Sequence, residues 1–223
     1  AKDAGSLAVD PDAAAYFLNP DRSPKAAGSY LTNPAYAKTL GAVASDPRAF
    51  YTGSIAAGIV EAVAETSGGR TPGAMTVADL ANYRSVRREP VCVSYRDKQV
   101  CGMPPPSSGG IAIAQILGVL GTFDLAQYRP TDIDRNGGRP TVQGVHLVSE
   151  AERLAYADRD KYVADTDFVP LPGGSPAAMV SKTYLKARAA LVNPARSMGT
   201  AQAGDLGAVP LGVHGPSPEN GTT

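Results

Sequence analysis

Few side chains in this sequence could do chemistry, and they are scattered along it. The chain has two histidines, His146 and His214, and two cysteines, Cys92 and Cys101. A zinc site in a protein needs about three or four ligands of these types, or acidic ones, held close together. His146 and Glu150 are one helical turn apart and share a helix face, but two ligands do not make a metal site. We interpret them as a solvated or capped pair on a helix surface, and we predict no metal and no cofactor.

A serine pair precedes two glycines in the segment PPPSSGG, residues 104–110. A nucleophilic serine on a strand-to-helix elbow has the pattern G-x-S-x-G, which is absent here. The three prolines lack amide donors and hold φ near about −65°, so this segment cannot be regular structure. We interpret it as a structural corner in which Ser107 or Ser108 caps the apolar helix that follows.

The two cysteines lie in the segment with the strongest strand pattern, VCVSYRDKQVC at residues 91–101. If Arg96 and Asp97 form the turn of a hairpin, Cys92 faces Cys101 at a non-hydrogen-bonded pair, with Cα atoms about 4.5–5.5 Å apart. That spacing is compatible with a disulfide. Arg-Asp is, however, a poor two-residue turn, and a shift of one residue would separate the cysteines. Two alternatives stay open: a cross-strand disulfide, or two reduced, half-buried thiols.

Helix signals dominate the remainder of residues 1–198. Asn33 and Thr76 are N-cap candidates, and Thr76 is followed three residues later by Asp79, as in a capping box. A further helix is predicted with Ser175 as its N-cap. The longest predicted helix runs from about Thr141 to Ala164, with an apolar stripe at Val145, Val148, Ala151, Ala155 and Tyr162 and a solvated face that includes Glu150, Glu152, Arg153, Arg159 and Lys161.

The charge balance excludes two classes of partner. There are 21 basic and 21 acidic side chains, so the net charge gives no footprint for nucleic acid or an anionic membrane. The longest apolar run, Ile111 to Leu120, is far shorter than the roughly 20 residues of a membrane span. The first residues show no signal peptide and no initiator Met, so we expect them to be an internal part of a longer precursor.

The composition changes after residue 198. Residues 199–223 are rich in Gly and Pro, which predicts a linker, and they end in SPENGTT. The two terminal threonines are either the end of a loose tail or the mark of a cleavage that belongs to the protein's chemistry. Composition alone does not decide between these interpretations.

Several blocks of the sequence closely resemble one enzyme family. They are YFLNPDRSPKAAGSYLTNPAYAKTL, FYTGSIAAGIVEAV, MTVADLANYRSVRREPV, CGMPPPSSGGIAIAQILGVLGTFDL and VHLVSEAERLAYADRDKYVADTDFVPLP. In this order they resemble the gamma-glutamyltransferases, over most of residues 16–190. The resemblance implies an α+β fold of the N-terminal-nucleophile hydrolase class, an αββα sandwich made from a precursor that cleaves itself into a large and a small subunit. Residues 1–198 then correspond to the mainly helical C-terminal half of the large subunit, and residues 199–223 to a linker that leads to the processing site.

The resemblance also implies a threonine nucleophile at the start of the small subunit. With Gly221-Thr222 as the cleaved bond, Thr222 is that nucleophile. Alternatively Thr222 and Thr223 both belong to the large subunit and the nucleophile is the next residue, or the chain is cut at an arbitrary point. A threonine hydroxyl needs a base to become a good nucleophile, and the new α-amine at the cleaved bond can act as that base.

What the resemblance implies about function leaves alternatives open. The first is transfer or hydrolysis of the gamma-glutamyl group of glutathione and related amides, in the periplasm or outside the cell, by a heterodimer with the small subunit. A relative with the specificity of a glutaryl cephalosporin acylase is the second, and a non-catalytic scaffold the third. No substrate-binding residue of the family falls on a matching position of this chain, so we assign none.

Overall fold

The computed structural model describes residues 4–66, 71–135 and 137–208. The chain divides into two compact units, residues 1–86 and 87–223, and each is described by itself. No helix in the described ranges combines the length and the apolar character needed to cross a bilayer.

Unit 1 consists of short helices. In chain order they are α1 (Ala4–Leu7), α2 (Pro11–Phe17), α3 (Pro34–Ser45), the 3-10 helix η1 (Pro47–Phe50), α4 (Gly53–Ala64) and α5 (Val77–Asn82).

The starts of the helices in unit 1 follow from local capping. Asn33 accepts a hydrogen bond from the amide of Tyr36 at the start of α3, as predicted. The capping box of α5 is confirmed: the Thr76 amide donates to Asp79 Oδ2 at 2.7 Å, and the Asp79 amide donates to Thr76 Oγ1 at 3.3 Å.

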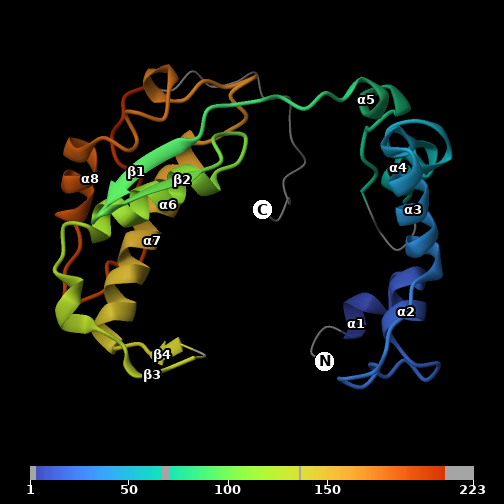
Figure 1. Cartoon of the computed structure of the whole chain (residues 1–223), viewed down its shortest axis with the longest axis horizontal. Helices are drawn as coiled ribbons and strands as arrows, with labels where there is room; N and C mark the ends of the chain where they lie inside the picture. Colours follow the sequence, from blue (N-terminus) through green and yellow to red (C-terminus); the bar gives the residue numbers. More distant parts are fainter. Residues whose placement is uncertain (1–3, 67–70, 136, 209–223) are drawn as a thin grey trace. The chain divides into compact units, whose positions relative to one another are not determined.

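Unit 2 combines helices with two hairpins. Its elements are β1 (Val91–Tyr95), β2 (Lys98–Gly102), α6 (Gly109–Leu120), the 3-10 helix η3 (Leu125–Tyr128), β3 (Thr131–Asp134), β4 (Gly137–Arg139), α7 (Val142–Tyr162), the 3-10 helix η4 (Pro172–Gly174) and α8 (Lys182–Ala189). Helix α6 is its central element: the hairpin β1–β2 lies across it, and α7 and α8 pack against it (Figure 1).

The hairpin β1–β2 has the predicted register. Cys92 pairs with Cys101 and Tyr95 with Lys98 around a two-residue turn. Arg96 adopts a left-handed conformation there with φ of 54°, which a two-residue turn of this kind demands even though Arg is not favoured in it. The other hairpin, β3–β4, is short and exposed.

Two clusters of buried apolar residues form the core of unit 2. One is centred on α6, α7 and α8 with Val119, Leu147 and Leu154, and the other packs Ile111 and Tyr162 against Met179. Side chains that carry no charge supply both clusters.

The structure corrects the predicted start of the last helix. Ser175 does not cap it, because residues 176–180 form an isolated turn in which the amides of Met179 and Val180 both donate to the Pro176 carbonyl. Helix α8 instead begins at Lys182, where Ser181 accepts a hydrogen bond from the Tyr184 amide. The N-cap of this helix is therefore Ser181 and not the predicted Ser175.

The long predicted helix is confirmed as α7, and three residues of its predicted apolar stripe, Ala151, Ala155 and Tyr162, are buried, but the other two are not. Val145 and Val148 are 49% and 37% exposed, whereas Glu150 is 1% exposed. The buried stripe passes instead through Leu147, Glu150, Ala151, Leu154, Ala155, Asp158 and Tyr162. Two carboxylates, Glu150 and Asp158, therefore lie on the buried face of α7.

Candidate functional site

The predicted processing site at Gly221, Thr222 and Thr223 lies outside the described residues and stays a prediction. Within the part of the chain that the structure describes, no group of three or more His, Cys, Asp or Glu side chains could hold a metal ion. His146 shares a hydrogen bond of 2.9 Å with the Asn193 carbonyl through its Nε2 atom.

The two cysteines face each other across the hairpin. Cys92 and Cys101 have Cα atoms 4.1 Å apart and are joined as a disulfide in the structure. The redox state in the cell stays a prediction, and a mass measurement before and after reduction tests it. Ser108, considered above as a cap, makes no capping hydrogen bond and instead accepts one from Arg159 Nε at 3.0 Å.

The segment that leads toward the predicted processing site is bound along α7. We call residues 193–208 the strap. It has no helix or strand, yet its backbone groups find partners on α7 and α8. Met198, Ala201, Ala203 and Leu206 of the strap also pack, partly buried, against the two apolar clusters. The described part of the predicted linker, residues 199–208, is therefore a packed segment.

The first strap contact site is the buried carboxylate of Glu150. It accepts hydrogen bonds from the Ser197 hydroxyl and from the Met198 amide, each at 2.7 Å. Arg153 lies beside it, with Nε 3.3 Å from Glu150 Oε1, and donates from Nη1 to the Gly199 carbonyl at 2.7 Å. One carboxylate and one guanidinium thus hold three consecutive strap residues.

The pKa of Glu150 reflects these contacts. Burial alone would raise the pKa, because it disfavours the charged form. The hydrogen bonds from Ser197 and Met198 outweigh this effect, and His146 and Arg153 add attraction, so the pKa lies below its ordinary value. Glu150 is therefore an ionised, buried acceptor at neutral pH.

The second strap contact site is centred on Asp158, two helical turns further along α7. Its Oδ1 accepts a hydrogen bond of 2.8 Å from the Gly204 amide. Its Oδ2 accepts from the Tyr184 hydroxyl at 2.7 Å and from Gln115 Nε2 at 3.1 Å. Asp158 and Gln115 are each 1% exposed, so this is a buried polar network.

A buried arginine balances the charge of Asp158. Arg188 Nη2 lies 3.0 Å from Asp158 Oδ1, and both side chains are almost completely buried. The same Nη2 donates to the Leu154 carbonyl at 3.1 Å and to the Gln202 carbonyl of the strap at 2.8 Å. Pairing and hydrogen bonding together offset the large cost of burying two charges.

The third strap contact site is the hydroxyl of Tyr162, at the end of α7. It donates to the Gly204 carbonyl at 2.6 Å and accepts from the Leu206 amide at 3.2 Å. The Tyr162 ring belongs to the apolar core, so a single side chain joins the core of unit 2 to the strap.

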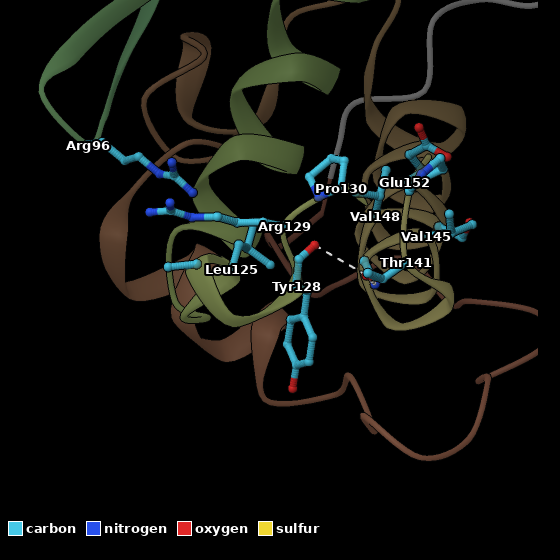
Figure 2. Close-up of a pocket in the computed structure, with 13 residues that line it drawn as sticks. Arg96, Leu125, Tyr128, Arg129, Pro130, Thr141, Val145, Val148 and Glu152 are labelled. Atoms are coloured by element: carbon cyan, nitrogen blue, oxygen red, sulfur yellow. Dashed lines mark hydrogen bonds between the residues drawn. The ribbon is translucent and has the colours of Figure 1, made fainter. Parts of the chain in front are cut away.

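An open cavity of unit 2 carries no comparable network. It has a volume of about 640 Å³, with Val145 and Val148 of α7 on one side and Leu125 and Arg129 on the other (Figure 2). Thr141 Oγ1 donates to the Tyr128 carbonyl at 3.2 Å at its edge. Its lining is mostly apolar and contains no nucleophile paired with a base, so we assign it no chemistry.

Sequence reasoning missed the residues that hold the strap. Glu150 was placed on the solvated face, and Asp158, Tyr184 and Arg188 received no role. One signal was present: Glu150 and Asp158 continue the spacing of Leu147, Leu154 and Tyr162 along one helix face. A carboxylate in line with an apolar stripe indicates a buried acid whose partners come from elsewhere in the chain.

Comparisons with known proteins agree on one family. The gamma-glutamyltranspeptidase family model matches residues 1–223. The glutathione hydrolase proenzyme of Escherichia coli strain K12 is 39% identical over 160 residues, which cover 71% of this chain and 25% of that proenzyme. The acylase ACY 1 proenzyme of Pseudomonas sp. strain SE83 is 36% identical over 190 residues, which cover 85% of this chain and 31% of that proenzyme. The chain thus spans between a quarter and a third of these relatives.

Solved structures give the same result. The gamma-glutamyltranspeptidase of Helicobacter pylori matches with a TM-score of 0.67 and 28% identity, over 91% of this chain and 54% of that one. The gamma-glutamyltranspeptidase of Pseudomonas nitroreducens, complexed with L-DON, matches with a TM-score of 0.62 and 30% identity, over 86% of this chain and 52% of that one. These neighbours are N-terminal-nucleophile hydrolases, so the predicted α+β fold class is confirmed.

Proposed function

Because the chain belongs to the gamma-glutamyltranspeptidase family, we propose that it is part of a self-processing enzyme that transfers or hydrolyses gamma-glutamyl groups. The substrates are glutathione and related gamma-glutamyl amides. The match of the family model to residues 1–223 carries this proposal, and the relatives named glutathione hydrolase proenzyme support it.

The proposed chemistry uses one threonine twice. In the precursor its Oγ attacks the carbonyl of the preceding residue, the C–N bond breaks, and the hydroxyl proton passes to the freed amine. Water then hydrolyses the resulting ester, which splits the precursor into two polypeptides, the large and the small subunit. In the mature heterodimer the α-amine takes the proton from Oγ, which attacks the gamma-glutamyl carbonyl, and the leaving amine takes a proton as the amide bond breaks. Water resolves the new ester in hydrolysis, and an acceptor amine resolves it in transfer.

Two positions compete for the nucleophile. If Gly221-Thr222 is the cleaved bond, Thr222 is the nucleophile, and Gly221 supplies the backbone freedom that the attack requires. If Thr222 and Thr223 both end the large subunit, the following residue is the nucleophile. Either choice places the catalytic residue downstream of the strap in the sequence, after residues 209–221.

The test uses the full-length precursor with Thr222→Ala and Thr223→Ala as a matched pair. With Thr222 as nucleophile, Thr222→Ala leaves one polypeptide on a denaturing gel and no acyl transfer, while Thr223→Ala still splits. Sequencing the first residues of the small polypeptide in the wild type identifies the cleaved bond. A wild-type precursor that never splits and has no activity on a gamma-glutamyl anilide would instead favour the non-catalytic scaffold.

A second candidate function has its own support. The acylase ACY 1 proenzyme is aligned over 85% of this chain, a longer stretch than the 71% aligned with the E. coli glutathione hydrolase proenzyme. Rates with a gamma-glutamyl anilide and with a glutaryl amide decide between the two specificities. A higher kcat/KM for the glutaryl amide would replace the first proposal by the second.

We also propose that the enzyme works in the periplasm or outside the cell. The Cys92–Cys101 disulfide supports this location, because disulfides persist in oxidising compartments.

A further inference from the structure

We propose that Glu150, Asp158 and Tyr162 are positioning residues for the self-cleavage, acting by holding the strap in one register on α7. This inference rests on the proposed function, because it needs a processing site downstream of the strap. None of the three is proposed to touch the reacting atoms.

All three side chains bind the strap through its backbone. Glu150 accepts from the Met198 amide, Asp158 accepts from the Gly204 amide, and Tyr162 bonds both the Gly204 carbonyl and the Leu206 amide. A backbone contact identifies a position along the chain rather than a side-chain type. Three such contacts along one rigid helix therefore set the register of the strap.

Burying the carboxylates of Glu150 and Asp158 has a free-energy cost. Glu150 and Asp158 are each 1% exposed, and a buried carboxylate is expensive unless it is fully hydrogen-bonded. Apolar side chains at these positions would bind a strap without that cost but without fixing which amide sits where. Directional bonds to single amides suit a role in which the exact register matters.

The strap joins the helices of unit 2 to the segment that contains the predicted processing site. Its contacts begin at Asn193, bonded to His146, and continue to Leu206, bonded to Tyr162, and residues 209–223 with the predicted processing site follow in sequence. If the strap is held in one register, the position at which the downstream segment begins is fixed. Cleavage by a neighbouring hydroxyl depends steeply on such positioning.

The first test replaces Tyr162 by Phe in the full-length precursor. The ring stays in the core and only the hydroxyl that binds the strap is lost. Tyr156→Phe is the matched control, because Tyr156 is 53% exposed on the same helix. We expect Tyr162→Phe to slow the appearance of two polypeptides by about tenfold, and Tyr156→Phe to leave the rate unchanged.

The second test pairs Glu150→Gln with Glu152→Gln, an exposed residue on the other side of α7. The amide keeps the size of the carboxylate but cannot hold the Ser197 hydroxyl and the Met198 amide as a charged acceptor does. We expect cleavage to slow about tenfold or more for Glu150→Gln only. Asp158→Asn should slow cleavage in the same way if the variant folds. If it does not fold, Tyr162→Phe still tests the inference.

Two further readouts separate positioning from general stability. Once cleaved, mature Tyr162→Phe enzyme should keep the wild-type kcat/KM, since the register is needed for cleavage. Amide hydrogen exchange should be faster at Gly204 and Leu206 and unchanged in the helices. Wild-type cleavage rates in both Tyr162→Phe and Glu150→Gln, or equal slowing in the two controls, would overturn the inference. Failure of the wild type itself to split would instead overturn the proposed function.

Discussion

The two units of the chain are both rich in helices, but different forces hold them. Among the described residues of unit 1, the buried apolar side chains are Leu18 and Ala56, whereas unit 2 has two buried clusters around α6 and α7. The helices of unit 1 are instead defined by local caps, with Asn33 and Thr76 as examples. Local signals therefore place a helix without supplying the burial that makes it stable.

The exposed side chains of unit 1 extend this comparison. A helix of about 12 residues is marginal in water without tertiary packing. Large apolar side chains that unit 1 leaves exposed include Phe17, Tyr30, Leu31, Tyr36, Leu40, Phe50, Met75 and Tyr83. Unit 2 also leaves large apolar side chains exposed, Ile133 and Phe168 among them, but it has two buried clusters as well. If the proposed small subunit covers unit 1, the exposed side chains of unit 1 are buried in the assembly.

The largest expected difference between the units comes from truncating one leucine in each. Leu154 on α7 is 1% exposed within a core cluster, and Leu154→Ala should lower the free energy of unfolding by about 2–5 kcal/mol. Leu40 on α3 is 50% exposed, and Leu40→Ala should cost less than about 1 kcal/mol. Urea unfolding of the full-length protein measures both values. An equal cost at Leu40 would break the comparison and show that a partner covers α3.

Two glycines test the same difference in packing between the units by adding a methyl group instead of removing side-chain atoms. A Cβ at Gly110, at the start of α6, would collide with the backbone of Gly102 and Met103, so Gly110→Ala should cost about 1–3 kcal/mol. A Cβ at Gly58 in α4 meets nothing, and Gly58→Ala should stabilise the helix by up to about 1 kcal/mol. Thermal melts of the two variants check the signs. Destabilisation by Gly58→Ala would place a covering partner against α4.

The sequence predicts local features of the structure better than features that depend on distant segments. Features that depend on neighbours in the chain were predicted: the Thr76–Asp79 capping box and the register that sets Cys92 opposite Cys101. These signals need only a few residues, and their physical causes act over that range.

Features that depend on distant segments were not predicted. Glu150 was expected in solvent because an acid on a helix usually is, and its partners Ser197 and Met198 lie 47 and 48 residues further along the chain, just before the predicted linker. The last helix was expected to begin after Ser175, but Ser181 caps it. The strap was missed for the same reason, since side chains of other elements satisfy its backbone.

The smallest expected effect is that of Tyr184, which tests how much the polar network around Asp158 contributes to the stability of unit 2. Burial first, and then the hydrogen bond to the negatively charged Asp158, raise the pKa of Tyr184 above its ordinary value. The folded state therefore keeps the phenol proton after the unfolded chain has lost it at a pH of about 10. The stabilisation is fully present below that pH and declines as the pH rises through the folded pKa. Tyr184→Phe should cost about 1.5 kcal/mol at neutral pH, the lower end of the range for a hydrogen bond to a charged group.

Measuring both proteins across the alkaline range isolates this contribution. The gap in free energy of unfolding between wild type and Tyr184→Phe should narrow as the pH rises above about 10, because only the wild type has this tyrosine to titrate. Tyr83→Phe in unit 1 is the control, since that tyrosine is 57% exposed. A gap that stays constant up to high pH would mean that the Asp158 network does not hold the Tyr184 proton, and that unit 2 depends on its apolar clusters alone.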